Sequence, residues 1–391
     1  MEFDLTETQK LFQRSARELF AQELPSVLAR ETTDSSAPHG ENIWRHLVDQ
    51  GWTGLIFPED FGGLGLQMVD LCVAFEEMGR ALVPGPFLST VAFAGSLIYK
   101  AGSDAQKEKY LKQIAGGQSK ATVALLEQSA SWNAEETGDL KLEASADTGD
   151  GLRLNGKKLF VTDAADAQLI VTAARSGGDL VLAIVPRDSA GLSLNPMPSV
   201  DTLRPLYEVV FENTLVPPSA ILAKGERAAQ ALAWAKDVAT LALAAEMTGG
   251  MQWVLDATVE YAKTRKQFGK AIGQFQAVQH HCANILLMTE STRSAVYYAA
   301  WTLDARPAEA PLAVSVAKAY ASDSFREVGN LGIQVHGGIG FTWDHEIHFY
   351  YKRAKAAELM FGDATYHRER IAKLIVDRAS KPVKAAGRTG N

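Results

Sequence analysis

The sequence predicts an α+β protein built as a helical N-terminal domain, a middle β-barrel or β-sandwich domain and a C-terminal four-helix bundle. Apolar residues recur at helical spacing over most of residues 1–120, form short runs between turn residues over 121–222, and return to helical spacing over 223–380. The length of 391 residues also suits two or three packed units. We therefore expect domain boundaries at these positions, followed by a flexible tail at 381–391.

The N-terminal region reads as helices separated by loops. Leu11, Phe12 and Phe20 follow Thr6 on one apolar stripe, as an amphipathic helix requires. The segment FPEDFGGLG at 57–65 has too many Gly and Pro residues for regular structure. Because its glycines permit close backbone approach, the segment is either a ligand-facing loop or a tight connection between helices.

The middle and C-terminal regions differ from each other in the spacing of their apolar residues. Apolar runs such as 152–163, 169–175 and 180–186 are separated by Asn-Gly, Gly-Gly and Pro signals, which is typical of a β-barrel or sandwich. Further on, Ala- and Leu-rich runs such as 238–263 predict long bundle helices. We expect a cofactor site at the junction of the bundle and the β-domain.

Composition excludes several classes of protein. The net charge of −7 argues against a nucleic-acid-binding protein, because phosphate binding needs a basic face. No apolar run approaches the ~20 residues that span a bilayer, and the acidic start MEFDLTETQK resembles neither a secretory nor a transit peptide. Two cysteines, Cys72 and Cys282, cannot form a disulfide framework. We therefore expect a cytoplasmic protein with no nucleic-acid partner and no membrane span.

No metal site is expected either. His280 and His281 are adjacent in sequence, so a helix would point their side chains apart, and His345 and His348 have no obvious third ligand beside them. The sequence also contains no P-loop, no Rossmann glycine fingerprint and no GxSxG motif. Nicotinamide-dependent enzymes and nucleophilic hydrolases therefore lose their usual sequence support.

Two further segments are unusual. In YAKTRKQFGKAIGQFQAVQH (261–280), Arg265 stands near Phe268, a pair that suits a ligand with a phosphate and a planar ring, unless the segment is a solvated charged turn. In IQVHGGIGFTWDHEI (333–347), three glycines fall within residues 337–340. Their backbone amides can cradle an anion, unless this is a plain loop.

Taken together, in this order and at these separations, segments 57–65, 261–280 and 333–347 resemble the acyl-CoA dehydrogenase flavoprotein family. The resemblance covers about residues 3–380, and it is most specific at 261–280. It implies FAD in a cleft between the β-domain and the bundle, in dimers or tetramers where each FAD reaches the neighbouring subunit. It also implies dehydrogenation of an acyl-CoA thioester to the 2-enoyl-CoA, with electron-transfer flavoprotein as the electron acceptor.

The resemblance also implies which residues hold FAD. Arg265 and Phe268 match the family's RxxFG motif, which contacts the FAD of the adjacent subunit, and Gln276 matches another FAD contact. Phe160 and Thr162 match a strand whose aromatic and threonine side chains lie against the flavin ring. Phe160 stands where the family usually has Trp.

A second part of the FAD site is matched less evenly. Gln334, Gly337 and Gly338 match the QxxGG segment that holds the adenosine diphosphate end. In contrast, the chain reads LLEQSASWN at 125–133, where the family often has Thr-Glu-Pro-Gly-x-Gly-Ser. The loss of the Pro and Gly residues puts flavin and CoA contacts there in doubt.

The catalytic base is the largest departure from the family. The reaction needs a carboxylate to take the α-proton, and many members place it as Glu in a Tyr-Glu-Gly-Thr segment. The matching segment, 359–368, has Gly362 at that position and Asp363 one residue later, and the family's alternative base position matches Ala239. Glu246 lies nearly two helical turns further on, about 10 Å along the same face. Asp363 and Glu246 are therefore candidate bases, unless Glu246 is an ion-paired structural residue or the chain has no base.

Three functions remain open at this stage. The chain is an active acyl-CoA dehydrogenase with a displaced carboxylate, or a non-catalytic partner subunit in a heteromeric dehydrogenase, or a related flavin oxidase or monooxygenase. The assembly is accordingly a homodimer or homotetramer, or a heterotetramer with a homologue. The acyl group is not set by the sequence.

Overall fold

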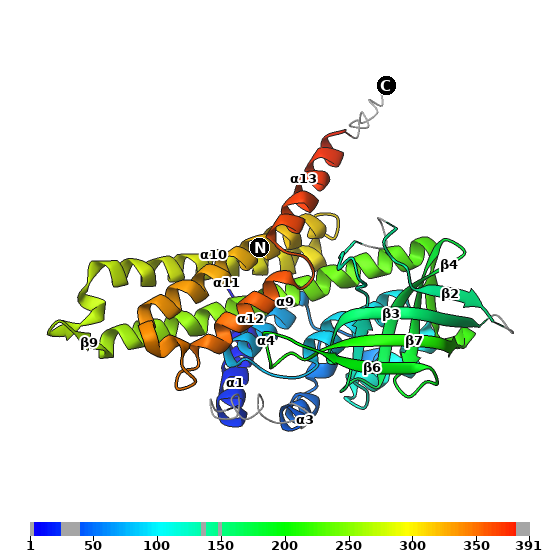
Figure 1. The fold of residues 1–391 in the computed structure, drawn as a ribbon, viewed down its shortest axis with the longest axis horizontal. Helices are drawn as coiled ribbons and strands as arrows, with labels where there is room; N and C mark the ends of the chain where they lie inside the picture. The colour runs from blue at the N-terminus through cyan, green and yellow to red at the C-terminus, as the bar shows by residue number, and fades with distance from the viewer. Residues whose placement is uncertain (1–3, 25–39, 134–137, 148–150, 381–391) are drawn as a thin grey trace, which may run out of the picture.

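The structure is a computed structural model that describes residues 4–24, 40–133, 138–147 and 151–380. Within these residues, helices come first, strands follow, and helices return, in the order that the sequence predicts (Figure 1). The expected flexible tail at 381–391 lies outside them. No helix of the described ranges combines the length and apolar composition that crossing a membrane requires.

Short helices make up the N-terminal region. The first begins after Thr6, whose hydroxyl accepts a hydrogen bond from the Gln9 amide, while the Gln9 side chain accepts one from the Thr6 amide. The elements are α1 (Glu7–Glu23), α3 (Glu41–Asp49), α4 (Met68–Ala81), a wide helical turn at Leu88–Gly95, α5 (Ser96–Ala101), α6 (Asp104–Gln106), a second wide turn at Lys107–Leu111, and α7 (Lys112–Ala115).

The glycine-rich segment 57–65 closes on itself between α3 and α4. The Gly63 amide donates to the Pro58 carbonyl, and the Gly65 amide donates to the Phe57 carbonyl. A Cβ atom on Gly63 would lie 2.0 Å from the Phe57 carbonyl oxygen, so only glycine permits this close approach. Of the two alternatives, the structure therefore favours a tight connection between helices.

The middle region is one twisted sheet of eight strands, in the order β6-β7-β3-β2-β4-β5-β8, with β1 joined in parallel to β4. Along the path from β6 to β8 these two end strands do not pair, so the hydrogen bonding is that of an open sheet. An extra residue interrupts the pairing of β3 with β7 between Lys158 and Val161, which is a bulge. The strands are β1 (Ala121–Ala124), β2 (Glu143–Ala146), β3 (Leu152–Thr162), β4 (Leu169–Ser176), β5 (Asp179–Pro186), β6 (Leu192–Met197), β7 (Leu206–Val216) and β8 (Ile221–Lys224).

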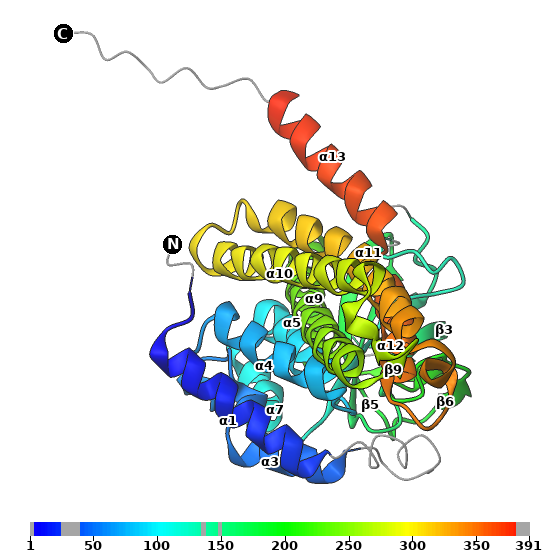
Figure 2. The same cartoon turned by 90° about the vertical axis from the view of Figure 1, so that its left-hand side faces the viewer.

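Long helices form the C-terminal bundle. Helix α9 runs from the sheet to the opposite end of the molecule, where a small hairpin leads into α10 (Figure 1). Both views show α13 standing out from the body (Figure 2). The elements are α9 (Gly225–Thr264), β9 (Lys266–Gln267), β10 (Lys270–Ala271), α10 (Gln276–Ala305), α11 (Ala310–His336), a 3-10 turn at Gly337–Phe341, α12 (Ile347–Leu359) and α13 (Ala364–Ser380).

The two helical regions share one hydrophobic core with sheet residues such as Val171, Leu182 and Ile184, and the sheet has a second, smaller core. Helices α4 and α9 cross at two glycines. A Cβ on Gly79 would lie 1.8 Å from the Glu246 carbonyl oxygen, and one on Gly249 would lie 1.7 Å from the Glu76 carbonyl oxygen. The backbones therefore touch at this point, and the contact fixes α9 beside the N-terminal helices near Glu246.

Candidate functional site

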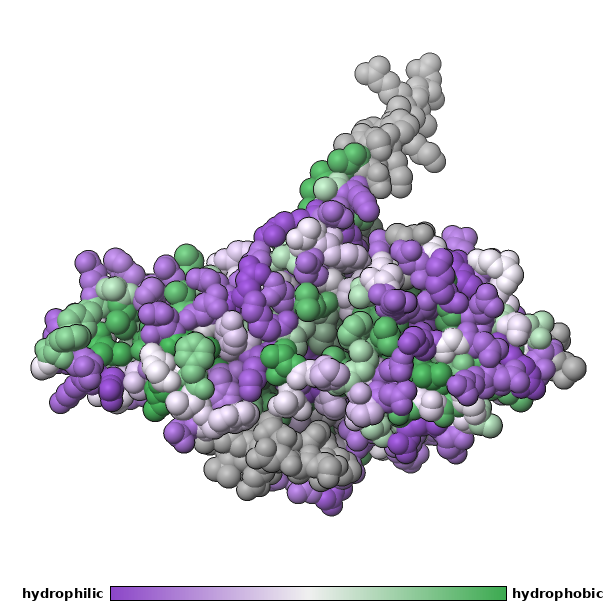
Figure 3. Space-filling model, viewed as in Figure 1, coloured by the Kyte–Doolittle hydropathy of each residue, from purple (hydrophilic) through white to green (hydrophobic). Residues whose placement is uncertain are grey.

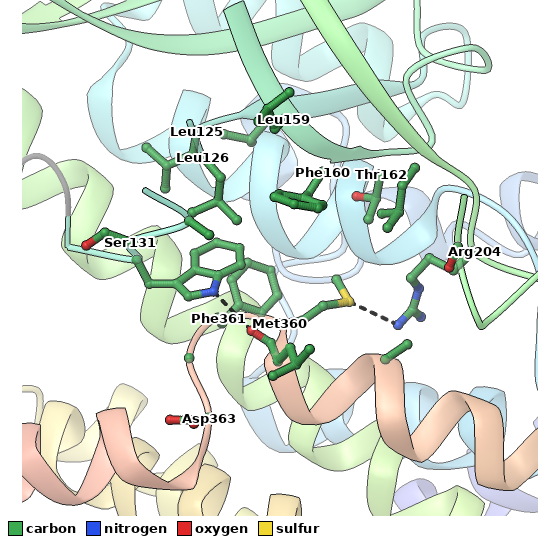
Figure 4. Close-up of a pocket in the computed structure, with 18 of the residues that line it drawn as sticks. Leu125, Leu126, Ser131, Leu159, Phe160, Thr162, Arg204, Met360, Phe361 and Asp363 are labelled. Atoms are coloured by element: carbon green, nitrogen blue, oxygen red, sulfur yellow. Dashed lines mark hydrogen bonds between the residues drawn. The ribbon is translucent and has the colours of Figure 1, made fainter. Parts of the chain in front are cut away.

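A cavity of about 540 Å³ lies where the sheet meets the helical bundle (Figure 4). Four parts of the chain enclose it: the wide helical turn at Leu88–Gly95, strands β1 and β3 with the residues that follow β1, the loop between β6 and β7, and the end of α12 with the turn before α13. Its lining is mostly apolar and aromatic, as in small-molecule sites. The lining includes Phe93, Leu125, Leu126, Ser131, Trp132, Leu159, Phe160, Thr162, Val200, Arg204, Leu206, Lys355, Leu359, Met360, Phe361, Gly362, Asp363 and Tyr366.

The sheet side of the cavity carries Phe160 and Thr162, the residues predicted to lie against the flavin ring, which together form the predicted flavin wall. Phe160 lies in the β3 bulge with φ of 56°, and the residue is 42% exposed. Its amide donates to the Met197 sulfur at 3.4 Å, while the carbonyl of Thr162 accepts a hydrogen bond from the Thr122 hydroxyl at 2.7 Å. A bulge re-aims side chains next to functional sites, and here Phe160 and Thr162 both face the cavity.

The opposite side is the turn in which the family usually carries its base. Gly362 has φ of 98°, which side-chain-bearing residues rarely adopt. A Cβ atom built there would lie 2.2 Å from Cδ1 and 2.7 Å from Cγ of Tyr366. The backbone and the neighbouring ring therefore both require glycine at the position of the missing carboxylate.

Side chains hold the carbonyl groups of this turn in place. The fully buried Lys318 ammonium donates to the Glu358 carbonyl at 3.1 Å, to the Gly362 carbonyl at 2.9 Å and to the Ser322 hydroxyl at 2.8 Å. Burial lowers the pKa of Lys318 to about 7, although Asp363 and Glu358 oppose the shift. All three donors of the ammonium are thus used inside the protein.

Two aromatic side chains, His367 and Trp132, also contact carbonyl groups of this turn. His367 Nε2 lies 3.0 Å from the Phe361 carbonyl oxygen, and burial, aided by nearby cationic groups, lowers the pKa of His367 to about 3. Trp132 Nε1 donates to the Leu359 carbonyl at 3.0 Å. The Phe361 ring packs against Trp132 and Phe93, with ring centroids 5.0 Å and 5.2 Å away. Aromatic rings thus occupy the part of the cavity next to Gly362.

Asp363 lines the cavity and also caps α13. Its Oδ1 accepts a hydrogen bond from the Tyr366 amide at 2.8 Å, as in a helix N-cap. Figure 4 shows Asp363 beyond Phe361, as seen from Phe160, with its carboxylate pointing away from the strand. The structure therefore brings Asp363 to the cavity but does not aim it at the predicted flavin wall.

Glu246 lies outside the cavity lining, in a buried ionic network. Arg204 Nη2 donates to both Glu246 oxygens at 2.9 Å and 2.7 Å, and Arg353 Nη1 donates to one of them at 2.5 Å. Arg353 Nε also pairs with Asp201. Burial raises the pKa of Glu246, but the two arginine charges outweigh it, so the pKa stays below its usual range. Its partners are those of a structural carboxylate.

A carboxylate in the middle region, that of Glu127, is also ion-paired and hydrogen-bonded. Glu127, in the divergent segment 125–133, pairs with Lys158 at 2.7 Å and accepts hydrogen bonds from the amides of Lys141 and Leu142. Glu127 and Lys158 are both buried. The carboxylate of this segment is therefore held within the sheet and is not presented to the cavity.

The remaining predicted FAD residues lie at the far end of the bundle, which carries β9 (Figure 1). Phe268, in the β9–β10 hairpin, has φ of 53° and is 89% exposed, and Arg265 is exposed where α9 ends. One chain therefore does not bring all the predicted residues together. The exposed members at this end are Arg265, Phe268, Gln276, Gln334, Gly337 and Gly338.

This far end is open for contact with another molecule. Ile339, Phe341 and Trp343, which follow the glycines Gly337 and Gly338, are exposed, as is Phe268, and Figure 3 shows hydrophobic residues at that end of the surface. A Cβ on Gly337 or Gly338 would meet no atom within 4 Å, so their backbone is accessible. The Gly337 amide already donates to the Ile333 carbonyl, but the exposed backbone at Gly338 leaves room for a phosphate to approach, and the exposed phenyl ring of Phe268 suits a planar base. These residues fit one end of FAD, as the wall of Phe160 fits the flavin ring.

Sequence reasoning missed three residues of the site. Arg204 and Trp132 line the cavity, and Lys318 holds the turn opposite the sheet. Lys318 gives a signal in the sequence, because it stands alone among apolar residues in AVSVAKAYA. Arg204 and Trp132 give none. In the described part of the chain, no three His, Cys, Asp or Glu side chains gather in a way that could hold a metal ion.

The class of protein follows from matches along the whole chain. Residues 6–118, 128–214 and 230–376 match the families described as the N-terminal, middle and C-terminal domains of acyl-CoA dehydrogenase. The chain therefore belongs to the acyl-CoA dehydrogenase family, and it is an oxidoreductase with FAD as its cofactor.

Individual relatives span almost the full length. The chain is 32% identical to acyl-CoA dehydrogenase IpdE2 of Mycobacterium tuberculosis over 351 residues, covering 89% of this chain and 91% of that protein. Its fold resembles the ChsE4-ChsE5 complex of Mycobacterium tuberculosis with a TM-score of 0.87 and 25% identity, covering 98% and 100% of the two chains. A variant of the Tcur3481-Tcur3483 steroid ACAD gives a TM-score of 0.85 at 30% identity, covering 96% and 99%.

Proposed function

We propose that the chain is the base-lacking subunit of a heteromeric, FAD-dependent acyl-CoA dehydrogenase. The complex converts an acyl-CoA thioester to the 2-enoyl-CoA, and electron-transfer flavoprotein accepts the electrons. The observation that carries this proposal is Gly362, where a φ of 98° and the Tyr366 ring leave no room for a catalytic carboxylate. A homologous chain then has to supply the base.

The chain's own carboxylates are committed to structure. Glu246 neutralises Arg204 and Arg353, and a base in a double ion pair would lose both contacts on accepting a proton. Asp363 caps α13 and points away from Phe160. Ala239, at the alternative base position, is buried and carries no acid. We therefore assign Glu246 a structural role.

The far end of the bundle provides the chain's contribution to its partner. When bound, FAD supplies the acceptor for the hydride that leaves the β-carbon of the acyl group. Arg265 offers a guanidinium for a phosphate and Phe268 a ring for a planar base, and both are fully presented outside their own subunit. We assign to this end the completion of the FAD site in the homologous subunit, whose carboxylate takes the α-proton.

The two names in each similar complex support a heteromeric assembly. The names ChsE4-ChsE5 and Tcur3481-Tcur3483 each join two designations. This chain covers 100% and 99% of the one chain that it matches in each structure. The aromatic cluster of Trp132, Phe361 and Phe93 beside Gly362 also fits a cavity that does not carry out the proton transfer.

The test is co-expression with a homologous chain that retains the carboxylate. The complex is expected to hold FAD, and Arg265→Ala in this chain is expected to lower its FAD content by weakening a charge-assisted phosphate contact. Lys263→Ala is the matched control, because Lys263 is an exposed cation on the preceding helical turn. Equal FAD content in both variants would contradict the assignment. Rapid peroxide formation would instead identify a flavin oxidase.

A second candidate rests on the presence of Asp363 in the cavity lining. In this case the chain alone dehydrogenates acyl-CoA, with Asp363 as a displaced base. Asp363→Asn would then slow anaerobic flavin reduction by about 100-fold or more while substrate binding stays intact. Full-rate reduction in this variant would exclude Asp363.

A further inference from the structure

Arg204 is a buried cation at the edge of the cavity. Arg204 is 7% exposed and lies in the loop before β7. It lines the cavity together with Thr162. The other cation of the lining, Lys355, keeps a side chain that is 39% exposed. A guanidinium is costly to bury unless its donors are used, so the partners of Arg204 show what it is placed to do.

The two arginines of the ionic network differ in how they use their donors. Arg353 bridges two carboxylates, since Nε pairs with Asp201 and Nη1 with Glu246. Arg204 uses only Nη2 on a carboxylate, that of Glu246. Its Nη1 meets the Met360 sulfur at 3.6 Å, and a thioether is a weak acceptor. In the described chain, Arg204 therefore lacks the second oxygen partner that Arg353 has.

The geometry fixes where the Nη1 edge of the Arg204 guanidinium points. Glu246 holds one edge of the Arg204 guanidinium from the bundle side, and Figure 4 shows the head group directed toward Met360 at the cavity. The walls beside it are apolar, with Leu206, Val200 and Phe160 in the lining. A ligand that fills this space thus meets a hydrophobic surface and, at one end, a fixed donor.

We propose that Arg204 binds an oxygen acceptor, a carbonyl or carboxylate, at the end of an apolar ligand that fills the cavity. Glu246 is a positioning residue for this contact, because its ion pair holds the guanidinium in place. The acceptor has two sources: the pyrimidine edge of the flavin ring, or an oxygen at the end of an acyl group remote from the thioester. This contact is separate from the base and applies to either candidate function.

The test uses Arg204→Lys, which keeps a positive charge for Glu246 but replaces the forked donors by one amine. Arg353→Lys is the matched control, because Arg353 belongs to the same network but not to the cavity lining. The probes are FAD, titrated into the chain alone and into its complex with the homologous chain, and the pair octanoyl-CoA and octanedioyl-CoA, titrated by calorimetry. Octanedioyl-CoA carries a terminal carboxylate that octanoyl-CoA lacks.

Loss of a hydrogen bond to a charged donor is expected to weaken binding about 10- to 100-fold. If FAD binding weakens by this factor in Arg204→Lys alone, the flavin edge is the acceptor. If the preference for octanedioyl-CoA over octanoyl-CoA is lost in Arg204→Lys alone, the acyl oxygen is the acceptor. Unchanged affinities for FAD and for both thioesters would overturn the proposal.

A second pair of variants keeps the test decisive if Arg204→Lys does not fold. Arg204→Met with Glu246→Gln removes both ion pairs of Glu246 and leaves Arg353 paired with Asp201. Arg353→Met with Asp201→Asn removes both ion pairs of Arg353 and leaves Glu246 paired with Arg204. The proposal is supported if the first double variant binds more weakly and the second does not. Equal binding by the two double variants refutes it.

Discussion

Gly362→Ala is expected to destabilise the protein through two separate effects. The backbone φ of 98° is unfavourable for alanine, and such strain costs about 1–3 kcal/mol. The new Cβ would also lie 2.2 Å from Cδ1 of Tyr366, and an overlap in a packed region adds about 1–3 kcal/mol. We therefore expect a loss of about 2–6 kcal/mol in the free energy of unfolding, measured by urea denaturation.

Gly178→Ala separates the two effects. Gly178 lies in the turn between β4 and β5 with φ of 92°, and a Cβ there would meet no atom within 4 Å. Its substitution should cost only the backbone part, about 1–3 kcal/mol. In a double-mutant cycle, Tyr366→Ala should recover about 1–3 kcal/mol in the Gly362→Ala background. If Gly362→Ala costs no more than Gly178→Ala, the Tyr366 ring does not exclude a side chain at position 362.

Three further predictions concern buried charges. Glu246→Ala leaves two buried arginines without their shared carboxylate and should cost about 3–5 kcal/mol in urea unfolding; a loss below ~1 kcal/mol would refute the network. Burial raises the pKa of Asp163 from 3.8 to about 6. The folded state therefore binds this proton more tightly, and a stabilisation of up to about 3 kcal/mol, complete below pH ~4, is lost as the pH rises through ~6. Asp163→Asn should remove this dependence, so a wild-type-minus-variant difference that stays constant from pH 4 to 7 would contradict it. Burial lowers the pKa of Lys318 from 10.5 to about 7, so the unfolded state binds that proton more tightly and stability should rise between pH ~7 and ~10. Lys318→Met should flatten this rise in Tm, and an unchanged slope would be inconsistent with a buried amine.

The order of helices, strands and helices was predictable because it depends on local periodicity. Thr6 and Gln9 cap α1 from positions three residues apart, and the apolar runs of β4 and β5 are joined by a Gly-Gly turn. Each of these signals lies within a few neighbouring residues. The family motifs were equally readable, since each is a short run. The absence of a carboxylate at positions 362 and 239 is also a property of the sequence itself.

The ionic and packing partners were not predictable, because they join distant segments. Glu246 pairs with Arg204, 42 residues earlier in the chain, and with Arg353, 107 residues later. No local sequence pattern predicts either contact. Likewise, the β3 bulge that turns Phe160 to the cavity depends on its register with β7, and the need for glycine at Gly362 depends on where the Tyr366 ring packs.

The separation of the predicted FAD residues is also a property of the fold. Phe160 and Arg265 belong to the same predicted site, yet a 40-residue helix, α9, carries Arg265 to the end of the bundle away from the sheet. The motifs alone do not set this distance. In the proposed assembly, this distance is the physical reason why a second chain completes each FAD site.

The most direct measurement is anaerobic flavin absorbance on adding acyl-CoA, made on FAD-loaded samples of this chain alone, of the carboxylate-bearing homologue alone and of their complex. The account predicts that the complex is bleached and that this chain alone keeps its yellow absorbance. Rapid bleaching of this chain alone, at the rate of the complex, would show that it holds a working base of its own and would contradict the account.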